Sequence, residues 1–232
     1  PLCDVLNWVS QARDLGAHTV SLTGGEPTCR PDWRELVSRC AEHGDVTLLT
    51  NGVALTADDA AFLAGHVSGA DHGIHVQISM DGARAATHDA VRGAAAFSRT
   101  LDFVRNLVSA GAGERTGLTM CLTALNLGEA TDLVLLASRL GVRRVHFLTV
   151  FPRGRAGAFW TEFAPEVTAY QATVLRLWEL RDSPEVEVQV SGCDLDLMFG
   201  DTGDGIPPCP LGHLLFLDSD GTAYPCELLT DD

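Results

Sequence analysis

The chain has 232 residues and is 46% hydrophobic, which suffices for one large α/β core with a small appendage. The formal net charge of −15, with only 16 scattered Lys and Arg residues, argues against a nucleic-acid partner. No apolar run approaches the roughly 18 residues of a membrane span, so we expect a soluble protein without a membrane partner.

Helix-type and strand-type patterns alternate along the first 150 residues. Apolar residues recur at helical spacing within residues 5–12, 33–40, 57–63, 97–108 and 133–140, and Thr56 followed by Asp59 is a capping-box signature for the third of these helices. Strands are predicted at "HTVSLT", "DVTLLT", "IHVQIS", "GLTMCLT" and "RRVHFLTV". This alternation indicates parallel strands with right-handed crossovers, in either an open doubly wound sheet or a (β/α) barrel.

The rhythm changes after Pro152. A helix is predicted from about Pro165 to Leu180, and "VEVQV" is predicted to be an isolated strand. The stretch "LLFLDSDGTAYPC" predicts a β-hairpin that turns at Asp218 to Gly221. The chain therefore ends in a small appendage that carries cysteines.

The stretch "SLTGGEPTC", residues 21–29, follows the first predicted strand. Gly24 and Gly25 would let a ligand lie against the backbone, and Glu26 offers an acceptor for a cationic amine. Pro27 fixes the direction in which the chain leaves. A Walker loop is excluded because no Gly-Lys-Ser/Thr follows, and the dinucleotide fingerprint fails because its further glycines are missing.

Polar residues also follow the later strands. Asn51 ends the second strand, and Ser79 and Asp81 end the third. Each alone is ordinary turn chemistry. Because ligands collect at the carboxyl ends of parallel strands, these residues together predict a polar ring suited to a ligand with an amine and ribose-like hydroxyl groups.

Five elements in this order resemble radical S-adenosylmethionine (SAM) enzymes of the SPASM/twitch group, namely "GGEPT", "LLTNG", "VQISMDG" with "THDAVRG", "FPRGRA", and the cysteine hairpin. The resemblance covers nearly the whole chain. It implies an α/β fold, a partial (β/α)6 TIM-like barrel without its first strand, with a small C-terminal cysteine-bearing β-hairpin. Residues 1–155 would form the core, residues 156–192 its end with a connecting helix and strand, and residues 193–232 the start of an auxiliary cluster domain.

The same resemblance implies the cofactor-binding residues, which would be Gly24, Gly25, Glu26, Pro27, Asn51, Ser79, Asp81 and Arg92. Gly24, Gly25 and Glu26 would meet the methionyl amino group of SAM. Ser79 and Arg92 would hold its ribose or carboxylate, with Asn51 and Asp81 nearby. Taken alone, Arg92 would be a solvated surface arginine. We expect His88 and Asp89 to be packing residues of a loop.

The seven cysteines of the chain, without a signal-peptide pattern, favour thiol or metal chemistry in the cytoplasm over disulfides. Cys209 and Cys226 fit the family pattern Cys-x9–15-Gly-x4-Cys, which implies an auxiliary iron–sulfur cluster with Cys193 as a further candidate ligand. The alternative is a pair of buried thiols in a small cap. Three more cysteines, Cys29, Cys40 and Cys121, are expected to be small core hydrophobes.

The family's catalytic [4Fe–4S] cluster requires the triplet Cys-x3-Cys-x2-Cys, and this chain lacks it. Cys3 stands alone at the start of the first predicted helix. Only five strands are predicted before Pro152, whereas the family barrel has six. We therefore expect the first strand and the cluster loop to precede Pro1, and residues 1–232 alone to be inactive.

The activity implied for the full-length parent is reductive cleavage of SAM to a 5′-deoxyadenosyl radical that modifies a substrate, with a flavodoxin or ferredoxin as electron donor. The tail resembles that of maturases of ribosomally made peptides, so a peptide is the expected substrate. One alternative is a tetrapyrrole or haem-pathway side-chain enzyme. Another is a cluster-less subunit that binds peptide or SAM without turnover.

Overall fold

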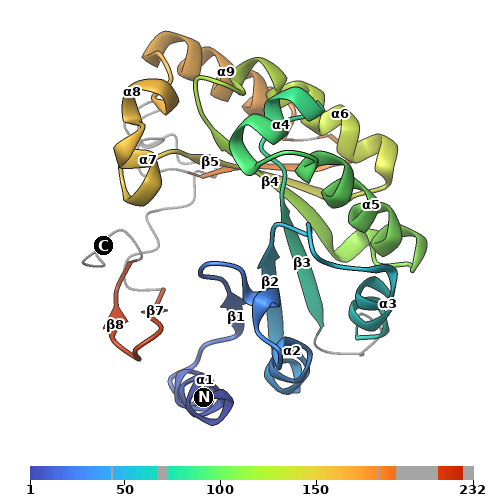
Figure 1. The fold of residues 1–232 in the computed structure, drawn as a ribbon, viewed down its shortest axis with the longest axis vertical. Helices are drawn as coiled ribbons and strands as arrows, with labels where there is room; N and C mark the ends of the chain where they lie inside the picture. The colour runs from blue at the N-terminus through green and yellow to red at the C-terminus, as the bar shows by residue number, and fades with distance from the viewer. Residues whose placement is uncertain (43, 67–72, 182, 192–213, 227–232) are drawn as a thin grey trace.

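The computed structural model describes residues 1–42, 44–66, 73–181, 183–191 and 214–226. Six strands form one sheet in chain order: β1 Thr19–Leu22, β2 Asp45–Thr50, β3 Ile74–Ser79, β4 Thr116–Leu122, β5 Arg144–Thr149 and β6 Glu187–Ser191. Every neighbouring pair is parallel. The strands form a curved sheet with helices along its outer side, as expected for part of a (β/α) barrel (Figure 1).

The α-helices within the described ranges are α1 Leu2–Asp14, α2 Trp33–Ala41, α3 Ala57–Gly65, α4 Ala85–Arg92, α5 Ala96–Ser109, α6 Ala130–Leu140, α7 Gly154–Ala158, α8 Trp160–Phe163 and α9 Val167–Glu179. Single 3-10 turns are η1 Pro27–Cys29, η2 Gly113–Arg115 and η3 Leu127–Glu129. None of the helices in this part of the chain is long and apolar enough to cross a membrane.

The two faces of the sheet differ in chemistry. On the helix-covered face, alternate residues such as Leu48, Ile78 and Phe147 are fully buried. On the other face the alternate positions are half-buried and many are polar, as at Gln77 and His146. Strands of a parallel sheet that is covered on both faces usually read as continuous apolar runs. The alternation here therefore leaves one face of the curved sheet available for polar contacts.

Local signals in the sequence were confirmed where they depend only on neighbouring residues. Thr56 accepts from the Asp59 N–H, and the Asp59 carboxylate accepts from the Thr56 N–H, so the capping box forms. Helix α6 ends at Gly141, which has φ 75. The alternation of elements and the helix between Pro165 and Leu180 are also confirmed, the latter as α9.

Two predictions, one about strand pairing and one about secondary structure, were wrong. The strand "VEVQV" is not isolated, because β6 pairs in parallel with β5 from Arg144↔Glu187 to Leu148↔Ser191. The five strands expected before Pro152 are present as β1 to β5, and the expectation of a further strand before Pro1 stays a prediction. His88 and Asp89 do not lie in a loop, since both belong to α4. Asp89 instead accepts hydrogen bonds from the N–H groups of Ala95 and Phe97 and so holds the start of α5.

The predicted hairpin is present as β7 Phe216–Leu217 and β8 Ala223–Tyr224. Its turn is closed by the Asp218 N–H, which donates to the Thr222 carbonyl at 2.9 Å. Gly221 has φ +90, and a Cβ there would lie 2.7 Å from the Trp8 ring. The hairpin turn therefore rests against the indole of α1, so segments from opposite ends of the chain lie side by side (Figure 1).

Candidate cofactor site at the carboxyl edge of the sheet

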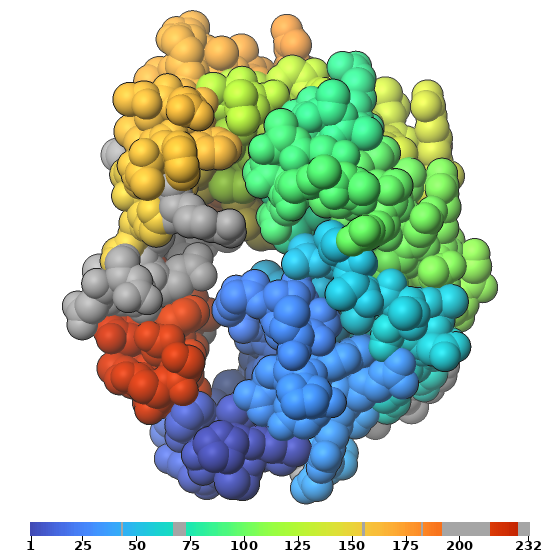
Figure 2. All heavy atoms as spheres, viewed as in Figure 1, coloured from blue at the N-terminus to red at the C-terminus, as the bar shows by residue number. Residues whose placement is uncertain are grey.

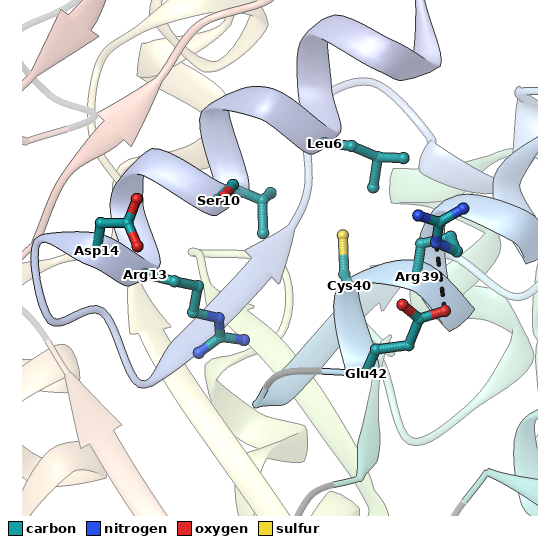
Figure 3. A pocket seen from close by; sticks show the side chains of 8 residues that line it. Leu6, Ser10, Arg13, Asp14, Arg39, Cys40 and Glu42 are labelled. Atoms are coloured by element: carbon teal, nitrogen blue, oxygen red, sulfur yellow. Dashed lines mark ion pairs between the residues drawn. The ribbon is translucent and has the colours of Figure 1, made fainter.

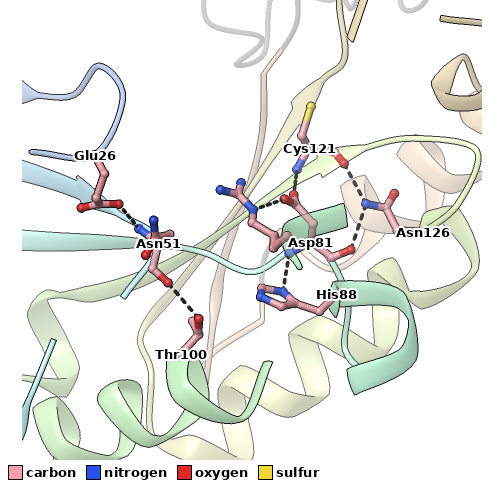
Figure 4. A network of polar contacts seen from close by, with 8 residues as sticks. Glu26, Asn51, Asp81, His88, Thr100, Cys121 and Asn126 are labelled. Atoms are coloured by element: carbon pink, nitrogen blue, oxygen red, sulfur yellow. Dashed lines mark hydrogen bonds and ion pairs between the residues drawn. The ribbon is translucent and has the colours of Figure 1, made fainter. Parts of the chain in front are cut away.

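The Glu26 carboxylate joins the loop after β1 to the end of β2. Its Oε1 accepts from the Thr28 hydroxyl at 2.6 Å and from the Thr50 hydroxyl at 2.7 Å. Its Oε2 accepts from the Asn51 N–H at 2.8 Å (Figure 4). Each carboxylate oxygen has two lone pairs, so Oε1 is fully used, whereas Oε2 can accept one more hydrogen bond. An ammonium group fits that remaining position.

The glycines before Glu26 leave space in front of the backbone. Gly24 has φ +120, which residues with a Cβ rarely adopt. A Cβ on Gly24 or on Gly25 would have no described heavy atom within 4 Å. The positive φ accounts for a glycine at position 24, and the pair together leaves open space in front of the backbone. Pro27 opens the turn η1, with Glu26 as its cap.

Asn51 is held by its backbone and by its side-chain oxygen. Its carbonyl accepts from the Thr100 hydroxyl at 2.8 Å, and Thr100 is completely buried in α5. Its Oδ1 accepts from the Val53 N–H at 2.8 Å, which is the geometry of an Asx turn. The amide NH₂ is the polar group of Asn51 that these bonds leave for a ligand.

Asp81 is the centre of a second, buried network. Its Oδ2 accepts from Arg92 Nε at 2.6 Å, and its Oδ1 accepts from the Cys121 N–H at 3.0 Å. Its own N–H donates to His88 Nδ1 at 3.1 Å, and its carbonyl accepts from Asn126 Nδ2 at 3.2 Å (Figure 4). Asp81 is only 3% exposed. Asp81 therefore positions neighbouring residues through hydrogen bonds and is too buried to reach a ligand itself.

Burial changes the protonation behaviour of two neighbours of Asp81. Burial lowers the pKa of His88, although the nearby Asp81 charge opposes this effect. Burial also raises the pKa of the Cys121 thiol to about 12, with the Asp81 charge acting in the same direction. Both groups are consequently neutral at physiological pH.

Ser79, predicted to contact the cofactor, ends β3 opposite Thr119 of β4 and is half-buried. It lies on the same face as Gln77, whose Nε2 donates to the Thr119 hydroxyl at 2.6 Å. The predicted residues thus fall into two groups at one edge, one around Glu26 and one around Asp81. Asn51 links the first group to α5, because its N–H donates to Glu26 and its carbonyl accepts from the Thr100 hydroxyl.

Sequence reasoning missed the contribution of Glu129 to this edge. Its carboxylate is 8% exposed and accepts from the N–H groups of Ala83 and Arg84 and from the Thr87 hydroxyl. These bonds fix the start of α4, which carries His88 and Arg92. The only signal in the sequence is a glutamate shortly after the polar end of β4.

The described cysteines do not form a cluster site. Cys3 and Cys29 are exposed, so the expectation of a core position for Cys29 was wrong, because η1 lies outside the layer between sheet and helices. Cys40 is buried as expected, and burial raises its pKa to about 11. In the described part of the chain, no three His, Cys, Asp or Glu residues are arranged to hold a metal ion.

The predicted auxiliary ligands are only partly described. Cys226 follows β8 and is half-buried. Cys193 and Cys209 lie outside the described residues, so their role stays a prediction. Cys121, expected in the core, is half-buried at the end of β4 on the polar face of the sheet.

One pocket among the described residues lies away from this edge. It has a volume of about 430 Å³ and lies between α1 and α2, lined by Leu6, Val9, Ser10, Arg13, Asp14, Arg39, Cys40 and Glu42 (Figure 3). None of the predicted site residues lines it. Figure 2 shows the molecule hollowed between the hairpin and the segments that follow β1.

Comparison with known proteins places the fold and the motifs in one family. The model of the radical SAM superfamily matches residues 2–137. The mycofactocin maturase MftC of Mycobacterium ulcerans is 35% identical over 217 residues, covering 92% of this chain and 56% of that protein. The PqqA peptide cyclase of Streptomyces rochei is 36% identical over 138 residues, covering 59% of this chain and 36% of that protein. The chain thus spans about half the length, or less, of these curated relatives.

The solved structure of Streptococcus suis SuiB bound to S-adenosylmethionine matches the whole chain with a TM-score of 0.79 at 16% identity, and this chain covers 54% of it. At that identity the match supports the fold. The family model extends over more than half of the sequence, from α1 through most of α6. This chain belongs to the radical SAM superfamily.

Proposed function

We propose that the protein containing this chain binds SAM at the carboxyl edge of the sheet and uses it to modify a peptide. The observation that carries the SAM assignment is the Glu26 carboxylate, which is fixed between β1 and β2 with one acceptor position left on Oε2. It lies beside two glycines with open space in front of them. An ammonium next to a fixed carboxylate and bare backbone is the arrangement that the methionyl end of SAM requires.

Each predicted residue has a physical role in this proposal. Glu26 accepts from the methionyl ammonium, and Gly24 and Gly25 allow the ligand to approach the main chain. Arg92, whose Nε is bound by Asp81, presents the rest of its guanidinium to the carboxylate of SAM. Ser79 and the Asn51 amide are placed to bond the ribose hydroxyl groups. Asp81 acts indirectly, through Arg92.

A [4Fe–4S] cluster, as in this superfamily, would supply the electron that cleaves SAM to a 5′-deoxyadenosyl radical. The described cysteines do not fit such a cluster, since they lie on separate elements. The chemistry of this chain's own residues is therefore binding and orientation of SAM and substrate. The auxiliary cluster on Cys209, Cys226 and Cys193 is part of the same proposal and rests on the spacing around Gly221.

A peptide is the proposed substrate because one relative is named a peptide cyclase, and the relatives that cover most of this chain are named mycofactocin maturases. The polar face of the curved sheet is consistent with this class. Half-buried donors and acceptors such as Gln77, Thr119 and His146 line it, and they can bond a peptide backbone.

The test is formation of 5′-deoxyadenosine by the natural protein that contains this chain, purified without oxygen and supplied with SAM, dithionite and candidate precursor peptides. Mass spectrometry would follow the cofactor product and the peptide. Peptide-dependent 5′-deoxyadenosine together with a mass change of the peptide is expected. If none of the tested peptides supports formation of 5′-deoxyadenosine but a tetrapyrrole does, the substrate is the tetrapyrrole of the haem-pathway alternative.

A second candidate function follows from the separated cysteines in the described part of the chain. In this alternative the protein binds SAM or peptide without turnover, as a recognition subunit. The same assay, combined with equilibrium dialysis, separates the two functions. A subunit of this kind retains SAM in dialysis and yields no 5′-deoxyadenosine with any precursor.

A further inference from the structure

The His88 imidazole is completely buried in α4, yet it is not satisfied as a packing residue. Its Nδ1 accepts the Asp81 N–H at 3.1 Å, so Nδ1 carries no hydrogen and Nε2 of the neutral ring carries it. That Nε2 has no hydrogen-bond partner among the described residues. A buried donor without a partner costs stability, and an aliphatic side chain would avoid this cost. The Nδ1 bond is therefore the reason for a histidine here.

The Nδ1 bond fixes the main chain of Asp81, whose other polar atoms are all engaged. The two carboxylate oxygens accept from Arg92 Nε and from the Cys121 N–H. The carbonyl accepts from Asn126. A shift of the Asp81 backbone would consequently move Oδ2, the oxygen to which Arg92 Nε donates.

His88 and Arg92 are four residues apart on α4 and therefore lie on the same face of the helix. His88 accepts a hydrogen bond from the main-chain N–H of Asp81, and Arg92 donates one to the Asp81 carboxylate. The Phe97 ring packs edge-on against the imidazole, with ring centroids 5.8 Å apart, and limits the ring's rotation. The Arg92 side chain is 32% exposed, so the guanidinium nitrogens beyond Nε can reach a ligand.

We propose that His88 is a positioning residue that acts through Asp81 to aim the Arg92 guanidinium at the carboxylate of SAM. The inference rests on the SAM site proposed above. A guanidinium that is already oriented loses less side-chain freedom when it binds a carboxylate through two parallel hydrogen bonds, and the Asp81 bond to Nε orients Arg92. His88 contributes selectivity for the carboxylate without touching the cofactor.

The experiment measures dissociation constants for SAM and for decarboxylated SAM by equilibrium dialysis with the natural protein. The variants are Arg92→Gln, His88→Leu and the double variant. Arg92→Gln is expected to weaken SAM about tenfold, equivalent to about 1.4 kcal/mol, and to leave decarboxylated SAM unchanged. His88→Leu is expected to weaken SAM severalfold with the same selectivity. The double variant should bind SAM no more weakly than Arg92→Gln.

Two further variants secure the interpretation. His88→Asn places a side-chain oxygen near the position of Nδ1 and should restore the preference for SAM. His66→Leu is the matched control, because His66 also contacts a phenylalanine, with 4.6 Å between the His66 and Phe62 ring centroids, but lies at the end of α3. If His88→Leu does not fold by circular dichroism, Asp81→Asn interrupts the same chain of contacts and should give the same selective loss.

Unchanged SAM affinity in folded His88→Leu, or equal weakening of both ligands, would overturn the positioning role while leaving the SAM site intact. An Arg92→Gln variant that binds SAM normally would overturn the assignment of Arg92 itself, and the positioning role with it. An additional loss in the double variant would show that His88 acts independently of Arg92 and would also overturn the inference.

Discussion

The Glu26 Oε2 accepts the Asn51 N–H at 2.8 Å, so a single carboxylate connects the ends of β1 and β2. This contact gives Glu26 two functions at once. It holds the edge of the sheet together, and it carries the acceptor proposed for the methionyl ammonium. Substitutions at Glu26 should therefore affect both stability and ligand binding.

Glu26→Ala is predicted to weaken SAM binding by about 1.5–3 kcal/mol, the range for hydrogen bonds that involve a charged group. It should also lower the free energy of unfolding by about 1 kcal/mol, because the Asn51 N–H and the Thr50 hydroxyl lose their acceptor. Calorimetric titration and urea unfolding measure the two effects. Glu35→Ala, at an exposed position of α2, is the control, and a Glu26 variant that binds SAM like the parent would contradict the assignment.

Replacing Cys209 and Cys226 together by Ala is predicted to remove one cluster's worth of iron and sulfide from the natural protein, because thiolates are the usual ligands of such clusters. Iron and sulfide analysis after anaerobic reconstitution makes the measurement. The double variant Cys3→Ala/Cys29→Ala is the control, since both thiols are exposed on separate elements. Equal iron in both double variants would favour the alternative of two packed thiols.

Stability should fall as the pH drops below about 6.5. Burial lowers the pKa values of His75, His88 and His146 below the ordinary value of 6.5. The unfolded chain therefore takes up protons in this range before the folded chain does. The stabilisation is complete above pH 6.5 and is lost as the pH falls toward the folded-state values.

The measurement is urea unfolding between about pH 7.5 and 5, above the range where carboxylates titrate. A histidine that is protonated only in the unfolded state contributes up to about 1.4 kcal/mol per pH unit to the slope. His146→Gln should make the slope shallower, whereas replacement of the exposed His18 by Gln serves as the control. A flat profile, or an unchanged slope in His146→Gln, would show that the ring titrates alike in both states.

Gly221→Ala is predicted to loosen the hairpin from α1. The new Cβ would lie 2.7 Å from the Trp8 ring, and Gly221 has φ +90, which an alanine adopts only with strain. We expect a loss of about 1–3 kcal/mol at this contact. The rate of limited proteolysis within the hairpin reports it.

Gly111 provides a matched control for the strain that a positive φ causes in alanine. Its φ is +89, but a Cβ there would meet no described atom within 4 Å. Gly111→Ala therefore measures the strain of φ alone, and the difference between the two variants measures the overlap with Trp8. The double variant Trp8→Ala/Gly221→Ala should recover part of the loss. Equal effects of Gly221→Ala and Gly111→Ala would mean that the indole does not support the turn.

The sequence by itself determined the elements whose signals are local. Alternating apolar residues specify β3, because one face of the strand is buried, and the Thr56 and Asp59 pair specifies the start of α3, because cap and helix are neighbours in the chain. The hairpin turn at Asp218 to Gly221 is equally local. The strand-end motif around Glu26 also pointed to the edge at which the candidate site lies.

Only the tertiary structure decided what depends on distant partners. The pairing of β6 with β5 brings residues more than 40 positions apart into register, and no local pattern encodes that. Helix α4 is short and polar, so the sequence predicts it only weakly. In the structure, hydrogen bonds with Asp81 and Glu129 hold its residues in place. The family resemblance pointed to Arg92, but only the tertiary structure shows that its Nε binds the carboxylate of the buried Asp81.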